Sequence, residues 1–347
     1  MKEFRLIKIS ADTPFQRGMQ YGEQAVSEIH TCISTYRDRF LATRSLGWKT
    51  VREMSMAHLP CIEAMMPDML EEAKGIAQGA GVDLEDIMVL NCRYEILHFP
   101  NPKECTAFAL KREATADGKV YVGQNWDQRC NLLEHTLLLD ITEEETGNRI
   151  FGMTEAGQLI RNGMNTRGVA QCSNSLHSVL DDNGVGIPSN FVRRKLLTMG
   201  SIREMVDLIR AAQRSVSVNY CLGSRENLVA DVEAVPGHTV RLDDREGILT
   251  HANNLLVNQD MDTFRDERFR GERLMDLLAL RRGKIDLAYI QNCLRDHYGH
   301  PGGICSHPSA KNKQWQTNAS IIYSLDDGKA WICYGPPCQG EYKEYQL

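Results

Sequence analysis

The pattern of apolar residues changes character near residue 100. Between residues 13 and 98, apolar positions recur at spacings of three and four, which is typical of helices that bury one face. The clearest case is the stretch 67–81, where Pro67 suits the first turn of a helix and Gly81 suits its exit. After Cys105, short segments rich in β-branched and aromatic residues alternate with turn residues, which predicts strands.

The predicted elements follow one another in blocks. Strands are expected at residues 106–110, 119–123, 136–141 and 149–153, over 217–251, and at 320–325 and 330–334, with Asn162 and Gly163 expected in a turn. Helices are expected over 189–212 and 264–296, and Asp83 and Ser201 are expected to cap helices. Strands grouped between helical blocks favour an α+β fold with separate layers over alternating βαβ units.

The composition is that of a globular protein that can bury a core. The 347 residues are 42% hydrophobic and 25% charged, which excludes collagen-like and disordered chains. The net charge is −6 and no basic arm is present, so we expect no nucleic-acid partner. The charged N-terminus and the lack of an apolar run of roughly 18 residues predict neither a secretory signal nor a membrane span.

The eleven cysteines include no Cys-x-x-Cys pair, and their odd number argues against a secreted disulfide framework. We therefore expect reduced thiols in a cytoplasmic protein. Cys305 and His307 are two residues apart and supply only two ligands, so the sequence predicts no metal site. Phosphate-binding and dinucleotide-binding motifs are also absent from the sequence, so no cofactor is expected.

Three polar sets stand at the ends of predicted strands. Cys105 precedes one strand, Gln-Asn-Trp-Asp at 124–127 ends the next, and Thr-His-Ala-Asn-Asn at 250–254 closes a third. If the three sets lie at one edge of a sheet, that edge holds a thiol nucleophile, a carboxylate and carboxamide donors. Acyl transfer needs this inventory, because it requires a nucleophile, a group that orients it, and donors for the oxyanion.

These segments also carry a resemblance to a known family. Glu-Cys-Thr-Ala-Phe at 104–108, Gly-Lys-Val-Tyr-Val-Gly-Gln-Asn-Trp-Asp at 118–127 and the set at 250–254 resemble the acyl-coenzyme A:6-aminopenicillanic acid acyltransferase family of N-terminal-nucleophile hydrolases. Asn91-x-Arg93-x-Glu95 and Gly303-Ile-Cys305 are similar to the family as well, so that the resemblance spans residues 10–335. It implies a four-layer αββα fold with antiparallel sheets.

The resemblance further implies self-cleavage between Glu104 and Cys105. Residues 1–104 would form a helical α chain that is retained, residues 105–347 would form a β chain, and the two together would make one domain. Cys105 would be both nucleophile and base, Asp127 would hold the new N-terminus, and Asn253 would serve the oxyanion. The candidates for the substrate pocket are Gln124, Asn125, His251, Asn254 and Ser306.

The function expected from these residues is that of an autoprocessed N-terminal-cysteine amidohydrolase or acyltransferase. Its substrates would be N-acyl amines, amino-acid amides or related small amides, cleaved through a thioester. Two points stay open. One is whether acyl-coenzyme A serves as an acyl donor, rather than as a bound cofactor, and the other is whether the chain self-associates.

Two alternatives compete with this reading. A papain-like protease has its cysteine, histidine and asparagine in the chain order of Cys105, His251 and Asn253, but its nucleophile opens a helix, whereas a strand is predicted after Cys105. The other alternative is a non-enzymatic binding protein in which Cys105 is a buried core residue.

Overall fold

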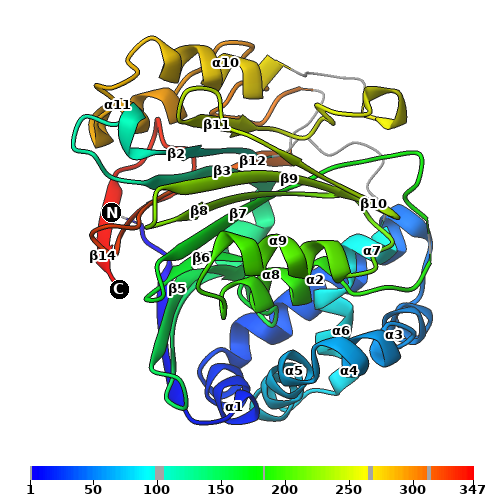
Figure 1. The fold of residues 1–347 in the computed structure, drawn as a ribbon. Helices are drawn as coiled ribbons and strands as arrows, with labels where there is room; N and C mark the ends of the chain where they lie inside the picture. Colours follow the sequence, from blue (N-terminus) through cyan, green and yellow to red (C-terminus); the bar gives the residue numbers. More distant parts are fainter. Residues whose placement is uncertain (1, 98–104, 183, 265–268, 311–313) are drawn as a thin grey trace.

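Two β-sheets form the centre of the protein, as seen in a computed structural model that describes residues 2–97, 105–182, 184–264, 269–310 and 314–347 (Figure 1). The larger sheet has the strand order β1 (Arg5–Ala11), β4 (Thr136–Glu143), β5 (Asn148–Glu155), β6 (Asn162–Asn165), β7 (Val169–Ser175), β8 (Val218–Ser224), β9 (Leu228–Val235) and β10 (His238–Leu242). The smaller sheet has the order β11 (Ile248–His251), β2 (Thr106–Leu110), β3 (Tyr121–Arg129), β12 (Trp315–Ser324), β13 (Lys329–Tyr334) and β14 (Tyr342–Gln346). Neighbouring strands are antiparallel except for the parallel pair β1 and β4.

Helices cover the outer face of each sheet. Figure 1 shows α10 and α11 over the smaller sheet, and the other helices on the outer side of the larger sheet. The helices are α1 (Pro14–Gln24), α2 (Val26–Arg44), α3 (Trp48–Met56), α4 (Leu59–Met65), α5 (Pro67–Ala80), α6 (Leu84–Asn91), α7 (Arg93–Leu97), α8 (Ser189–Leu196), α9 (Ile202–Ala211), α10 (Phe269–Ala279) and α11 (Leu287–Leu294). The predicted α+β class and the αββα layers are confirmed.

Alternation along β2 explains how the layers are held together. Ala107 and Ala109 face the apolar cluster between the two sheets, whereas Phe108 and Leu110 pack in the cluster beneath α10 and α11. Successive side chains of a strand point to opposite faces, so a strand between two layers needs apolar residues at every position. All five residues of β2 are buried.

Three local predictions were wrong. Asn162 and Gly163 lie in β6 rather than in a turn, because Gly163 pairs with Gly152, where an added Cβ would lie 1.9 Å from the carbonyl oxygen of Asn162. The glycines thus allow two backbones to approach closely. The strand expected at 119–123 begins at Tyr121 and continues as β3 to Arg129. The strands β1, β7 and β14 were not anticipated.

Helix ends follow the predictions more closely. Gly81 ends α5 in the left-handed conformation at φ 67°, as a glycine at a helix exit does. Ser201 caps α9 by accepting a hydrogen bond from the N–H of Glu204. Asp83 stands at the N-cap of α6, but its carboxylate accepts from Arg52 instead of capping the helix.

Glycines also bring α1 and α5 into close contact. A Cβ at Gly18 would lie 2.0 Å from the carbonyl oxygen of Glu72, and a Cβ at Gly75 would lie 2.0 Å from that of Phe15. The two helix backbones therefore touch at both positions. Among the helices of the described ranges, none is both long and apolar enough to cross a bilayer.

Candidate active site

Strand pairing brings the three polar sets to one end of the smaller sheet. β2 lies between β3 and β11 and is antiparallel to both, with Thr106 opposite Asn125 and Ala107 opposite both Gln124 and His251. The start of β2 therefore lies beside the final residues of β3 and the end of β11. Cys105, Asp127 and Asn253 belong to these three strand ends, so the structure brings together the residues that the sequence analysis singled out.

Cys105 precedes β2 in an unusual backbone conformation. Its φ is 45°, in the left-handed region that residues with a β-carbon rarely adopt and that costs about 1–3 kcal/mol. The side chain is 3% exposed and joins the apolar cluster between the sheets, with Sγ 4.0 Å from the carbonyl oxygen of Asp127. Glu104, the other residue of the predicted cleavage site, lies outside the described residues.

Two side chains orient the carboxylate of Asp127, which is buried. The hydroxyl of Thr317 donates to Oδ1 at 2.6 Å, and Nη1 of Arg270 donates to Oδ2 at 3.3 Å. Thr317 is opposite Asp127 on the neighbouring strand β12. The carboxylate is thus charge-paired and locked in direction, and buried charges need both.

Arg270 also forms a hydrogen bond with Asn253, another predicted site residue. Its Nη2 donates to Oδ1 of Asn253 at 2.7 Å, while Nδ2 of Asn253 donates to the carbonyl oxygen of Ser175 at 2.9 Å. The guanidinium therefore links Asp127 to Asn253. Sequence reasoning missed Arg270 and Thr317, because no motif marks them and each meets Asp127 across more than a hundred residues of chain.

Gln124 and Asn125 use their amide groups within the protein. Asn125 Nδ2 donates to the carbonyl oxygens of Leu294 at 2.8 Å and of Ile304 at 2.9 Å. Gln124 Nε2 donates to the carbonyl oxygen of Ser173 at 2.7 Å and to Asn174. These contacts hold neighbouring segments in place, and a role of either residue in binding substrate stays a prediction.

His251 faces two hydrogen-bond acceptors. Its Nε2 lies 3.0 Å from Oε1 of Glu233, and its Nδ1 lies 2.8 Å from the carbonyl oxygen of Ala252. A ring with a proton on each nitrogen satisfies both of these acceptors. Burial by itself lowers the pKa of His251, but Asp231 and Glu233 outweigh burial and raise this pKa to about 9.

The last two pocket candidates lie on different sides of the site. Asn254 lines a cavity of about 300 Å³ between β11 and α10, together with Thr250, His251 and Gly271. Ser306 contacts Thr317 through its backbone: its N–H donates to the Thr317 hydroxyl at 2.9 Å, and its carbonyl oxygen accepts from the Thr317 N–H at 3.0 Å. Ser306 therefore supports the residue that orients Asp127.

The sequence of the chain is similar to those of known proteins. The model of a family described as "Acyl-coenzyme A:6-aminopenicillanic acid acyl-transferase" matches residues 114–339. The chain is 26% identical over 339 residues to the "Acyl-coenzyme A:6-aminopenicillanic-acid-acyltransferase 40 kDa form" of Emericella nidulans, covering 94% of this chain and 91% of that protein. It is 21% identical over 385 residues to an uncharacterized protein of Archaeoglobus fulgidus, covering 93% of this chain and 62% of that protein.

Solved structures that match include a bile acid hydrolase and a penicillin acylase. A variant of conjugated bile acid hydrolase from Clostridium perfringens is 14% identical, with a TM-score of 0.45 over 70% of this chain and 97% of the other. Penicillin V acylase from Agrobacterium tumefaciens is 13% identical, with a TM-score of 0.47 over 66% of this chain and 83% of the other.

Proposed function

The chain belongs to the acyl-coenzyme A:6-aminopenicillanic acid acyl-transferase family, and from this premise we propose that it is an amidohydrolase or acyltransferase with Cys105 as its nucleophile. The observation that carries the proposal is the meeting of Cys105, Asp127 and Asn253 at one end of the smaller sheet. Arg270 fixes the carboxylate and the carboxamide relative to each other, at 3.3 and 2.7 Å. A nucleophile placed beside preoriented polar groups is the arrangement that acyl transfer requires.

The first reaction that we propose is cleavage of the chain itself. The Cys105 thiol attacks the carbonyl carbon of Glu104, a C–S bond forms, and the C–N bond between the residues breaks while the proton passes to the departing amine. Water then hydrolyses the thioester. Cleavage removes the peptide bond that holds φ of Cys105 at 45°, so the strain stored there supports the reaction.

Turnover then uses the freed α-amino group as the base. An α-amine has a pKa of about 7.7–8.0, so a useful fraction is neutral near pH 7 and can accept the thiol proton. The position of Cys105 Sγ 4.0 Å from the Asp127 carbonyl oxygen supports a role of Asp127 in holding that amine. Asn253 would donate to the oxyanion, and the loss of one such donor costs about 10²–10³ in rate.

The contacts of His251 argue against the papain-like alternative. A papain-type histidine directs one ring nitrogen at the cysteine sulfur, where it holds the proton that the thiol gives up. Both nitrogens of His251 instead face oxygen acceptors, Glu233 on one side and Ala252 on the other. The base in this proposal is therefore the amine of Cys105 itself.

For the substrate we propose small amides with an acyl group on nitrogen, including N-acyl amines and amino-acid amides. Water as acceptor of the thioester gives hydrolysis, and an amine as acceptor gives transfer. Acyl-coenzyme A is an alternative acyl donor, since the relative in Emericella nidulans is named for it. A panel of N-acyl amides and acyl-coenzyme A, each with and without an acceptor amine, separates these reactions by their products.

The deciding experiment compares Cys105→Ala with Cys172→Ala. Cys172 is another buried cysteine between the two sheets, so it is a matched control for the loss of a thiol. We expect wild type and Cys172→Ala to appear as fragments 1–104 and 105–347, the second beginning at Cys105, and Cys105→Ala to stay a single inactive chain of 39.2 kDa. Fragments from Cys105→Ala, or activity in an uncut chain, would refute the proposal, and an inactive, uncut wild type would favour the binding-protein alternative.

A further inference from the structure

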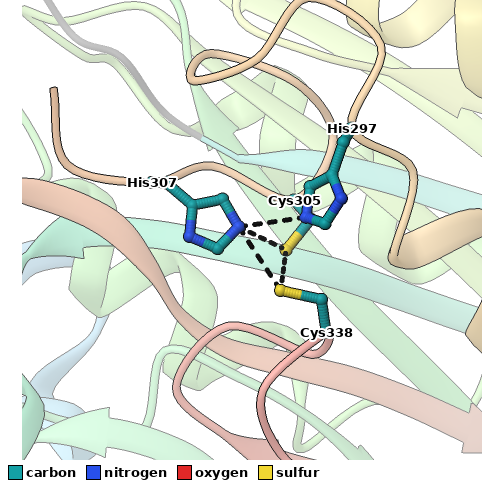
Figure 2. Close-up of side chains that lie close together, drawn as sticks. All are labelled: His297, Cys305, His307 and Cys338. Carbon is teal, nitrogen blue, oxygen red and sulfur yellow. Dashed lines mark hydrogen bonds between the residues drawn. The ribbon is translucent and has the colours of Figure 1, made fainter.

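Two cysteines and two histidines meet beside the smaller sheet, and none of them belongs to the candidate active site. Figure 2 shows the side chains of His297, Cys305, His307 and Cys338 pointing toward one another. The first three come from the segment between α11 and β12, and Cys338 comes from the segment between β13 and β14. One ligand atom from each residue can be chosen so that all four lie within 4.8 Å of one another.

Four of the six distances between these atoms are close to the edges of a tetrahedron around one zinc ion. Zn–S and Zn–N bonds of about 2.3 and 2.0 Å at tetrahedral angles give separations of about 3.8 Å for S–S, 3.5 Å for S–N and 3.3 Å for N–N. The Sγ atoms of Cys305 and Cys338 are 3.6 Å apart, and each lies 3.4 Å from Nε2 of His307. The Nε2 atoms of His297 and His307 are 3.0 Å apart.

We propose that His297, Cys305, His307 and Cys338 bind one Zn²⁺ ion in a structural site. A tetrahedral set of two sulfur and two nitrogen ligands is typical of zinc, and four protein ligands leave no open position for a catalytic water. On binding, the two thiols release their protons to solvent and bind as thiolates. Cys338 comes from a different segment than the other three residues, which is why the spacing of Cys305 and His307 alone did not reveal the site.

The backbone already holds the ligands in this arrangement. The N–H of Cys305 donates to the carbonyl oxygen of Asp296 at 3.0 Å, and the carboxylate of Asp296 accepts from Arg273 at 2.8 Å. The N–H of His307 donates to the carbonyl oxygen of Pro301 at 2.9 Å. Because the ligand loop is preformed, it loses less conformational entropy when the metal binds.

The site adjoins the candidate active site through two sets of contacts. Ile304, next to Cys305, accepts from Asn125 at 2.9 Å, and Ser306 contacts Thr317, whose hydroxyl orients Asp127. Zinc would fasten this segment to the β13–β14 connection through Cys338. The metal would therefore act as a support for Asp127 and would take no part in the chemical step.

The test measures metal content in the full chain, purified without a polyhistidine tag and without chelators. Multi-element mass spectrometry is expected to find one zinc per chain in wild type, and a strong loss in Cys338→Ser and His297→Ala. Both altered side chains are exposed, so neither substitution opens a hole in the core. Cys61→Ser and His238→Ala, which lie away from the cluster in α4 and β10, are matched controls and should keep their zinc.

Cobalt gives a second readout that does not depend on activity. After zinc is removed with a chelator, Co²⁺ added to wild type should give the visible absorption of a tetrahedral thiolate complex, and Co²⁺ added to Cys338→Ser should not. Wild type without metal, a disulfide between Cys305 and Cys338, a different bound metal, or zinc retained in both variants would each overturn the proposal. Cys105→Ala should be inactive but should still contain one zinc per chain. The zinc result therefore does not depend on the proposed catalytic function.

Discussion

The contacts of His251 predict that the protein loses stability as the pH rises from 7 to 9. The unfolded chain releases the histidine proton near pH 6.5, whereas Asp231 and Glu233 raise the folded-state pKa to about 9. A histidine with a raised pKa stabilises the folded state fully below pH 6.5, and this stabilisation is lost as the pH rises through 9. At 1.36 kcal/mol per pKa unit, and with titration incomplete at both ends, the loss between pH 7 and 9 is about 2 kcal/mol.

The assay is chemical denaturation at several pH values between 7 and 9, combined with an NMR titration of the histidine rings. Asp231→Asn removes one of the two carboxylates that raise the pKa of His251, so this variant should lose less stability over the same range. Asp243→Asn is the matched control, because the side chain of Asp243 is 85% exposed. It should behave as wild type does.

A flat stability profile in wild type, or a His251 ring that titrates below pH 7, would refute the reasoning. Either result would mean that the two carboxylates do not hold His251 in its charged form. The two acceptors would then not hold the His251 ring in place, and the papain-like alternative would have to be considered again.

Three further predictions concern the neighbours of Asp127 and the core. Arg270→Met should lower kcat far more than it raises KM and should destabilise the protein by about 3–5 kcal/mol, because it leaves the Asp127 charge buried without its cation; Arg270→Lys, which keeps the charge but lacks the planar guanidinium, should restore activity only in part. Thr317→Val should slow self-cleavage on a time course of gels, since it removes a hydrogen bond to a charged group worth about 1.5–3 kcal/mol; an unchanged rate would show that the bond is dispensable. Gly75→Ala should lower Tm through overpacking of about 1–3 kcal/mol or more, whereas Gly47→Ala, where an added Cβ meets nothing within 4 Å, should not.

The local pattern of the sequence was sufficient for most elements and for the class of chemistry. Apolar spacing predicted the helical blocks and the strands on either side of Cys105, and strand β2 has the predicted bounds of 106–110. Periodicity works here because each helix or strand must turn one apolar face to a neighbouring layer. The three polar sets were also visible, because each interrupts an apolar strand at its end.

Other features depend on contacts between distant parts of the chain. Arg270 reaches Asp127 across 143 residues, and Cys338 reaches Cys305 across 33 residues, so neither contact leaves a periodic signal. Turn chemistry likewise suggested a loop at Asn162 and Gly163, where pairing with Gly152 makes a strand. The amino-acid sequence alone determined most of the helices and strands and which side chains can react, because those properties are largely local. Tertiary structure decided which side chains meet, because only packing of the two sheets and their helices brings the residues around Asp127 and the four candidate zinc ligands within bonding distance.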